Sequence, residues 1–320
     1  MVLTSDHALS FGTASLGGLY QPVQPEDAQA VLQTAWDAGI RYFDTAPHYG
    51  NGASEHRLGD FLRDKTGWVL STKVGRLLTP DAAPPAVING FHSALPLKQH
   101  FDFTYDAIMR SVEDSFQRLG LNRIDILYVH DIGDPGAGTD TAHHRAQLLD
   151  SGQKALRQLK AEGVVAAVGL GVNTVEICEE LLGQVEMDLI LLAGRYTLLD
   201  QTAKDRLFPL LCKHGTKLVI GGVFNSGILA TGPLRGAMYD YQPAPQHILD
   251  RTAGIARMCD RHQVSMAAAA LQFPAQSDHV VSTLIGTSKP GSLTRNIAQY
   301  HQELPQELWA DLRQAGVIRE

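Results

Sequence analysis

The chain of 320 residues is long enough for two ordinary domains or for one α/β barrel, and its 44% hydrophobic content can fill a large core. The formal net charge of −7 and the pI near 6.0 argue against nucleic acid or an anionic membrane surface as a partner. No apolar run reaches the length of about 18 residues that a membrane span needs, so we predict no such span.

The cysteines and the start of the chain bear on location. Three cysteines, Cys178, Cys212 and Cys259, lie far apart without metal-ligand spacing, which predicts reduced thiols in a cytoplasmic protein. Residues 1–10 contain neither a basic region nor an apolar run, so we expect no secretory signal. Small polar molecules are the expected partners, and the oligomeric state is left open.

Short β-rich runs alternate with amphipathic helical stretches along almost the whole chain. Strands are predicted at 9–15, 41–44, 68–73, 124–130, 164–170, 189–192, 217–220 and 280–285. Helices are predicted at 25–38, 53–63, 105–119, 146–161, 175–182, 202–213, 246–261, 293–300 and, in the tail, 304–312. Such alternation indicates parallel strands joined by helical crossovers.

Eight βα units in a chain of this size favour a (β/α)8 TIM barrel that occupies residues 1–320 as a single domain. A doubly wound dinucleotide fold is the alternative, but neither 11–18 nor 169–174 supplies its G-x-G-x-x-G turn. Two long loops, 75–102 and 222–245, are predicted at the C-terminal face, where barrel active sites form.

Four polar residues are predicted at one rim: Asp44, Lys73 and His130 end neighbouring strands, and Tyr49 lies on the loop that follows Asp44. We call them the tetrad. Consecutive barrel strands are neighbours, so the four side chains can converge. A phenol beside an ammonium and an imidazole suits proton transfer, because a nearby cation favours the phenolate. Asp44 is expected to pair with Lys73, and His130 to orient a substrate oxygen.

Nearly the whole chain resembles the aldo-keto reductases, whose Asp-Tyr-Lys-His tetrad matches these four positions. The segments 43–50, 118–127 and 222–227 and the Trp309 tail resemble the aldose 1-dehydrogenase branch. That branch includes enzymes acting on L-fucose, L-galactose or D-arabinose, and also pyridoxal 4-dehydrogenases.

The resemblance implies NAD-dependent oxidation of an aldose at C1 to a lactone, with Tyr49 as the general base helped by the other three residues. A pyridoxal or general aldehyde oxidoreductase on the same tetrad is the alternative. A binding protein like the potassium-channel β subunits is a further one, although no extension precedes the first predicted strand.

The resemblance also implies a nicotinamide dinucleotide across the barrel mouth. Thr13, Asn173 and Phe224 are expected around the nicotinamide, with Phe224 stacking on it. The junction 285–296 is expected to receive the adenosine phosphate, through Gly286, Ser288, Lys289, Arg295 and Asn296. NAD is favoured, because Gly286 and Ser292 stand where NADP-binding relatives usually place a Lys and an Arg. Lys289 and Arg295 keep NADP as an alternative.

The predicted mouth is rich in polar groups, which suits a hydroxyl-rich substrate. Arg76, His92 and Asp131 are the predicted substrate-binding residues. Asn89, Lys98, His100 and Asp102 add donors and acceptors in the same long loop. No metal site is expected, because His143-His144 and Asp131…Asp134 lack a third ligand or helical spacing.

Overall fold

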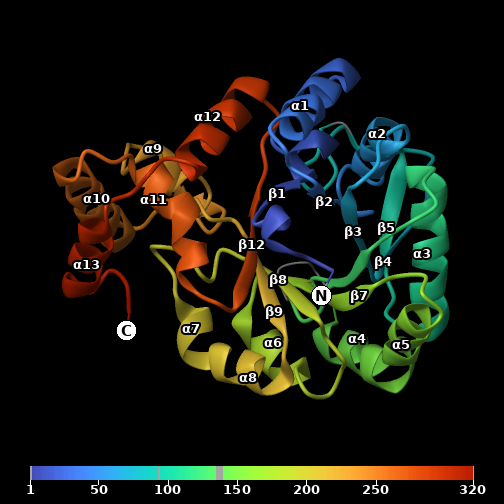
Figure 1. Ribbon diagram of the computed structural model, residues 1–320. Coiled ribbons are helices and arrows are strands. Elements are labelled where there is room, and N and C mark those ends of the chain that lie inside the picture. Colours follow the sequence, from blue (N-terminus) through green and yellow to red (C-terminus); the bar gives the residue numbers. More distant parts are fainter. Residues whose placement is uncertain (1, 93, 135–139, 320) are drawn as a thin grey trace.

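The protein is described by a computed structural model covering residues 2–92, 94–134 and 140–319. Eight parallel strands in this part of the chain close into a barrel, in which each strand pairs with the next one along the chain (Figure 1). They are β1 (Leu9–Gly12), β2 (Tyr42–Asp44), β3 (Val69–Val74), β6 (Ile126–His130), β7 (Ala167–Val172), β8 (Leu189–Ala193), β9 (Lys217–Gly221) and β12 (Val280–Ile285). The predicted (β/α)8 barrel is confirmed.

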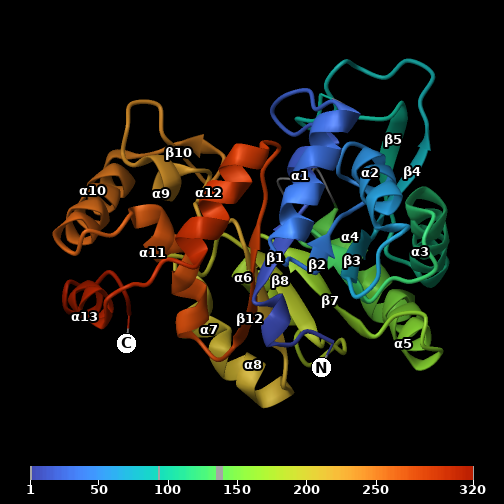
Figure 2. The same cartoon turned by 45° about the horizontal axis from the view of Figure 1, so that its top comes forward.

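Helices surround the barrel, as Figures 1 and 2 show. They are α1 (Pro25–Asp37), α2 (Ala53–Leu62), α3 (Tyr105–Leu119), α4 (Thr141–Gln147), α5 (Gln153–Ala161), α6 (Val175–Leu181), α7 (Thr202–Arg206), α8 (Phe208–His214), α9 (Ile228–Thr231), α10 (Gln246–Arg261), α11 (Met266–Gln272), α12 (Pro290–Tyr300) and α13 (Gln306–Gln314). None of those in the described part of the chain combines the length and apolar character that crossing a membrane requires.

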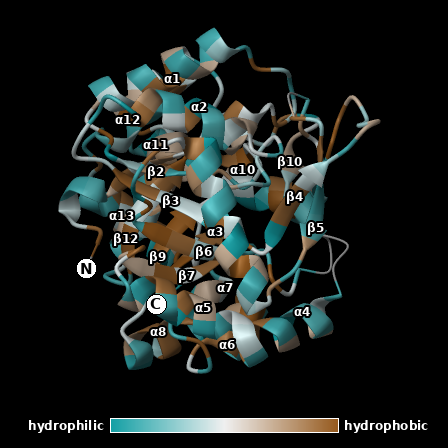
Figure 3. Cartoon of the chain, turned by 90° about the vertical axis from the view of Figure 1, so that its right-hand side faces the viewer, coloured by the Kyte–Doolittle hydropathy of each residue, from teal (hydrophilic) through white to brown (hydrophobic). Residues whose placement is uncertain are grey.

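Two cores form on the two sides of the sheet. The strand faces that look outward pack against the helices, and Figure 3 shows the hydrophobic colour concentrated there and on the strands. A smaller core fills the barrel itself, with Leu3 at its N-terminal end. Because side chains alternate along a strand, Tyr42 and Asp44 share the inner face of β2, and Tyr128 and His130 share that of β6. The strand geometry therefore directs the side chains of Asp44 and His130 into the mouth of the barrel.

Several predicted elements differ from the observed ones. The first strand ends at Gly12 rather than at residue 15, because the chain then curls into a 3-10 turn over Ala14–Gly17. The helix predicted at 146–161 is broken by a π-helical turn over Leu148–Gly152. A Cβ on Gly152 would meet the Phe103 carbonyl oxygen at 2.1 Å, so this turn packs directly on backbone.

Helix α11 was not predicted. Its sequence, Met-Ala-Ala-Ala-Ala-Leu-Gln, has no polar face and so lacks the amphipathic period on which the other helices were recognised. The sequence cue that could have predicted this helix is Ser265, because serine is a preferred N-cap residue. In the structure its hydroxyl accepts a hydrogen bond from the Ala268 N–H at 3.1 Å.

Both long loops contain secondary structure. The segment 75–102 holds an antiparallel hairpin of β4 (Arg76–Pro80) and β5 (Leu97–Phe101), which the prediction treated as irregular. The segment 222–245 holds α9 and a short hairpin of β10 (Met238–Tyr239) and β11 (Gln242–Pro243). Residues of both segments line the cavity described below, which places them at the C-terminal face as predicted.

The contact between α2 and α3 depends on Gly59. A Cβ at this position would lie 1.8 Å from the Leu119 carbonyl oxygen. Gly59→Ala should therefore lower the free energy of unfolding by about 2 kcal/mol or more, since backbone cannot make room cheaply. Chemical denaturation measures the change.

Gly254→Ala is the matched control, because its Cβ would meet only the end of Arg257, at 4.0 Å, in the middle of α10. This variant should be stabilised by roughly 0.5 to 1 kcal/mol through helix propensity. Equal effects of the two substitutions would contradict the packing argument.

Candidate active site

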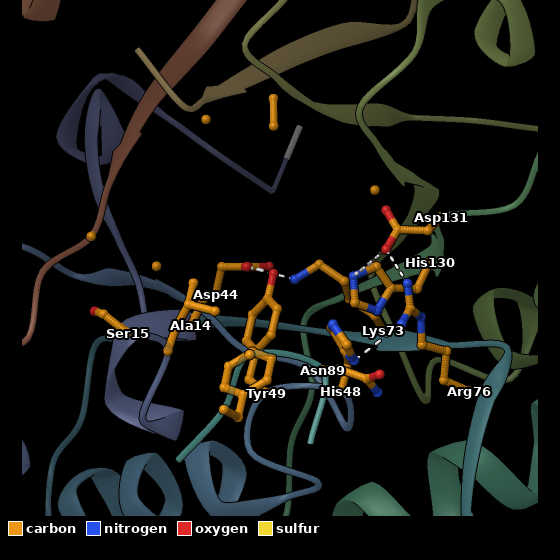
Figure 4. A pocket seen from close by; sticks show the side chains of 18 of the residues that line it. Ala14, Ser15, Asp44, His48, Tyr49, Lys73, Arg76, Asn89, His130 and Asp131 are labelled. Atoms are coloured by element: carbon orange, nitrogen blue, oxygen red, sulfur yellow. Dashed lines mark hydrogen bonds and ion pairs between the residues drawn. The ribbon is translucent and has the colours of Figure 1, made fainter. Parts of the chain in front are cut away.

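A cavity of about 1230 Å³ opens at the C-terminal ends of the barrel strands. Figure 4 shows side chains from several strands and loops converging on it. Its wall includes Asp44, Tyr49, Lys73 and His130, so the structure brings the four tetrad residues to one place.

The centre of the site is a buried ion pair between β2 and β3. Lys73 Nζ lies 2.6 Å from Asp44 Oδ2, and both side chains are only 1% exposed. The other carboxylate oxygen accepts a hydrogen bond from the Ser71 hydroxyl at 2.7 Å, and Lys73 also donates to the Thr45 carbonyl at 2.9 Å. Burial by itself lowers the pKa of Lys73, but the negative charge of Asp44 outweighs it and raises that pKa. The lysine therefore stays charged.

Tyr49 lies beside this ion pair, on the turn between β2 and α2. Gly50, Asn51 and Gly52 all have positive φ, which turns the chain sharply and sets the ring over the cavity. Lys73 Nζ is 4.6 Å from the centre of the Tyr49 ring, so its positive charge acts on the phenol. From the sequence we expected a nearby cation to favour the phenolate, and the charge of Lys73 does act to lower the pKa of Tyr49. Burial nevertheless raises the pKa of Tyr49, and Lys73 only opposes the rise.

His130 completes the group. Its ring meets that of Tyr49 edge to face, with centroids 5.8 Å apart and an interplanar angle of 89°. Burial, reinforced by the positive charges of Arg76 and Lys73, holds the pKa of His130 well below its usual value. The imidazole is therefore neutral and can donate one N–H without carrying a charge.

A chain of hydroxyls continues below the ion pair, and sequence reasoning missed it. Ser71 Oγ, bonded to Asp44, lies 3.1 Å from the Tyr42 hydroxyl, which is itself 3.1 Å from the Tyr128 hydroxyl. Tyr42 and Tyr128 are fully buried inside the barrel. Each stands two positions before a tetrad residue and so shares its strand face. This spacing in the sequence could have indicated that both tyrosines lie beneath the tetrad. The chain anchors Asp44 from beneath.

A second polar group lines the wall next to His130. Arg76 forms an ion pair with Asp131, whose carboxylate lies 3.4 Å from His130 Nε2 (Figure 4). Arg76 is 5% exposed, and its Nε is buried without a hydrogen-bond partner among the described residues. His48, which the sequence did not single out, bonds to Arg76 through Nδ1 at 3.0 Å. Arg76 and Asp131 are thus placed in the cavity, as the predicted substrate contacts would require.

Of the other polar residues predicted at the mouth, Asn89 and Lys98 line the cavity, whereas His92, His100 and Asp102 do not. His92 is exposed, and the neighbouring Phe91 is the residue that is buried and lines the wall. His100 pairs with the Thr79 hydroxyl on the outer hairpin, and Asp102 accepts from the Thr104 N–H at the start of α3. Neighbouring side chains in a hairpin strand face opposite sides. Because the prediction treated this segment as irregular, it could not tell which side chains face the cavity.

The predicted cofactor residues also divide into two sets. Asn173, Gly286, Ser288 and Lys289 line the cavity, which extends from the tetrad to the start of α12. The other four do not line it: Thr13, Phe224, Arg295 and Asn296.

Local contacts explain these placements. The Thr13 hydroxyl is buried and donates to the Asp44 carbonyl at 2.9 Å, so it ties β1 to β2. Phe224 packs on the outer core, and Tyr241 is an aromatic residue that lines the cavity instead. Arg295 donates to Ser292 Oγ at 3.0 Å on the surface of α12. Among the described residues no cluster of His, Cys, Asp or Glu has the arrangement of a metal site.

Comparison with known proteins identifies the family. The profile of the Aldo/keto reductase family matches residues 8–316. The chain belongs to the aldo-keto reductases. It is 47% identical to pyridoxal 4-dehydrogenase of Microbacterium luteolum and 43% identical to D-threo-aldose 1-dehydrogenase of a Pseudomonas species, each over 97% of this chain and 94% of the relative. A holo form of an aldo-keto reductase from Bacillus halodurans has the same fold, with a TM-score of 0.72, 23% identity, and coverage of 98% of this chain and 92% of that one.

The protein is therefore an oxidoreductase that acts on CH–OH groups with a nicotinamide cofactor. The cavity fits such a group. At Gly286 a Cβ would lie 2.9 Å from the Gly12 carbonyl oxygen, so glycine lets the backbones of β12 and β1 lie close together in the cavity wall. Backbone N–H groups at the start of α12 are suited to a phosphate, and Ser288 and Lys289 lie at that point.

The position of Tyr49 generates a prediction about proton transfer. Tyr49→Phe should lower turnover by roughly 10² to 10⁴, the range of general acid–base catalysis, with little change in cofactor affinity. Because the pKa of Tyr49 is raised, the phenol is protonated at neutral pH. Oxidation needs the deprotonated form, so turnover of the unmodified enzyme should increase as pH rises, and Tyr49→Phe should abolish that increase.

Tyr105→Phe serves as the control, since Tyr105 bonds to Gln158 on the outer helices, away from the cavity. Steady-state kinetics over a pH series make the measurement. A Tyr49→Phe enzyme with ordinary turnover would move the role to another residue, and His130 is the next candidate.

Proposed function

We propose that the enzyme oxidises the cyclic hemiacetal of an aldose at C1 to the lactone, with NAD as the cofactor. Tyr49 is the general base and takes the proton of the C1 hydroxyl. Lys73, held by Asp44, stabilises the phenolate form, and His130 donates a hydrogen bond to the reacting oxygen. The C1 hydrogen leaves as hydride, for which the cofactor supplies the acceptor.

The observation that carries this proposal is the juxtaposition of the tetrad with a wall of hydrogen-bonding groups. Arg76, Asp131, His48 and Gln99 lie on one side of the cavity, next to His130. A ring bearing several hydroxyls offers partners to such groups. These groups also bond to one another, and a substrate without hydroxyls would leave their remaining donors, such as Arg76 Nε, unpaired, which is costly in a buried site.

A second candidate is supported by the 47% identity to pyridoxal 4-dehydrogenase. Pyridoxal and aldoses share one chemical feature: each carries an aldehyde and a hydroxyl placed to add to it, and so forms a cyclic hemiacetal. The same base and hydride acceptor would convert either hemiacetal to a lactone. The two candidate functions thus share one reaction and differ in which ring, a sugar or a pyridine, the cavity wall recognises.

We also propose a cytosolic location, which the absence of any disulfide among Cys178, Cys212 and Cys259 supports. All three cysteines lie in the described part of the chain. The channel-subunit alternative loses its basis, because the two relatives above 40% identity are both dehydrogenases by name.

Cofactor choice can be tested directly. NAD should give a kcat/KM about tenfold or more above that of NADP, because Gly286 and Ser292 offer no cation to a 2′-phosphate. Lys289→Met should lower efficiency with NADP further and leave efficiency with NAD nearly unchanged. Lys213→Met, an exposed lysine on α8, is the control. Efficiency with NADP equal to or above that with NAD would show that Lys289 or Arg295 binds the phosphate.

Substrate class is tested with a panel of L-fucose, L-galactose, D-arabinose and pyridoxal. We expect at least one aldose, of the L-fucose or L-galactose type first, to exceed pyridoxal in kcat/KM, because the wall beside His130 offers several hydrogen-bonding groups. Reduced nicotinamide is followed by absorbance, and the product is identified as the lactone. Preference for pyridoxal, or no oxidation of any aldose, would overturn the sugar assignment while leaving the tetrad intact.

A further inference from the structure

His48 stands in the cavity wall next to the tetrad and has no role in the mechanism above. Its ring centroid is 5.6 Å from that of His130, 6.1 Å from that of Tyr49 and 5.2 Å from that of Phe91. Figure 4 shows the ring between Tyr49 and Arg76. The ring of His48 therefore adjoins the rings of both Tyr49 and His130, the two residues that act on the reacting oxygen in the proposed function.

The surroundings of His48 fix which ring nitrogen carries the proton. Nδ1 lies 3.0 Å from Arg76 Nη1, which can only donate. It also lies 2.8 Å from Gln99 Nε2, and that amide donates to Asn51 Oδ1 at 2.7 Å, so its orientation is set. Gln99 Oε1 also lies 3.0 Å from Nδ1, but this oxygen accepts from Arg76 Nη1 at 3.2 Å. Because Arg76 Nη1 can only donate, Nδ1 acts as the acceptor. The single proton of the neutral ring is therefore on Nε2.

Among the described residues, this Nε2–H has no protein acceptor. None of the hydrogen bonds among residues 2–92, 94–134 and 140–319 that involve His48 uses Nε2. Burial and the positive charge of Arg76 lower the pKa of His48 to about 3, so the ring stays neutral at any pH at which the enzyme would work. The wall thus presents a fixed, uncharged N–H to the cavity.

We propose that His48 is a substrate-binding residue whose Nε2–H donates to the hydroxyl on the carbon next to the one oxidised. This role rests on the proposed function. The reacting oxygen lies between Tyr49 and His130, and His48 is adjacent to both rings. The hydroxyl on the neighbouring carbon is the next polar group along the substrate. His48 therefore selects hemiacetals that carry a hydroxyl at that carbon over those that do not.

Two variants distinguish the two possible roles of His48, donating a hydrogen bond to the substrate and accepting one from Arg76. In His48→Asn, the amide oxygen takes the place of Nδ1 and can still accept from Arg76 and Gln99, but nothing reaches the position of Nε2. In His48→Gln, the amide nitrogen takes the place of Nε2, while the acceptor for Arg76 is lost. His56→Asn, on the exposed face of α2, is the control for the substitution itself.

The experiment measures kcat/KM for the best aldose of the panel and for its 2-deoxy analogue. The unmodified enzyme and the His56→Asn enzyme should favour the parent sugar by about tenfold, the usual effect of one neutral hydrogen bond. His48→Asn should lose about tenfold on the parent sugar, change little on the deoxy sugar and keep the same pH profile. His48→Gln should retain most of the discrimination.

Two results would overturn the role of His48. One is an equal loss on both sugars in His48→Asn. The other is normal discrimination in His48→Asn together with loss in His48→Gln, which would make His48 a support for Arg76. An unmodified enzyme that oxidises no aldose would instead refute the proposed function, and the role of His48 with it. Thermal melting and NAD affinity show whether each variant is folded.

Discussion

The buried ion pair between Lys73 and Asp44 is the interaction on which the rest of the site depends. Removing both charges from water costs several kcal/mol per ion, and the mutual attraction repays this only when further hydrogen bonds complete the pair. Ser71 and the Thr45 carbonyl supply those bonds. The Ser71 hydroxyl is linked in turn to Tyr42 and so to the barrel interior. The geometry of the mouth is thus fixed from below by the barrel itself.

This arrangement sets two opposing influences on Tyr49. Burial disfavours the phenolate, and the ammonium of Lys73 favours it. Asp44 keeps the lysine charged and in place, although its own negative charge works against the phenolate. The neighbouring imidazoles of His130 and His48 are both held neutral by burial and by Arg76. We propose that a single titrating phenol between neutral donors is what allows one site to remove a proton while binding a polar ring.

Much of the fold followed from the sequence, because its signals were periodic. Buried β-rich runs between amphipathic helices predicted the barrel strands, and the strand ends at Asp44, Lys73 and His130 indicated the mouth. Signals that are not periodic were missed. Helix α11 is apolar all round, and the hairpin of β4 and β5 lay inside a stretch rich in breakers.

Side-chain direction limited what the sequence could say about the site. His92 and Phe91 are adjacent, yet only Phe91 lines the cavity, and Tyr241 lines it where Phe224 was expected. His48 was overlooked because one histidine before a tyrosine has no special spacing. Its meaning depends on Arg76 and Gln99, which come from a hairpin that the sequence did not predict. The rise in the pKa of Tyr49 could not be predicted, because burial, the larger influence, is set by the whole fold.

The measurement that tests the central claim most directly is the titration of Tyr49 itself, by NMR of isotope-labelled tyrosine, with the Tyr49→Phe enzyme used to assign its signal. It compares the unmodified enzyme with an Asp44→Asn/Lys73→Met double variant, which removes both charges and leaves no unpaired ion in the core. Lys73 lowers the pKa of Tyr49 more than Asp44 raises it. The account therefore predicts a higher pKa for Tyr49 in the double variant, with the alkaline rise of kcat displaced in the same direction. An unchanged or lower pKa would contradict it.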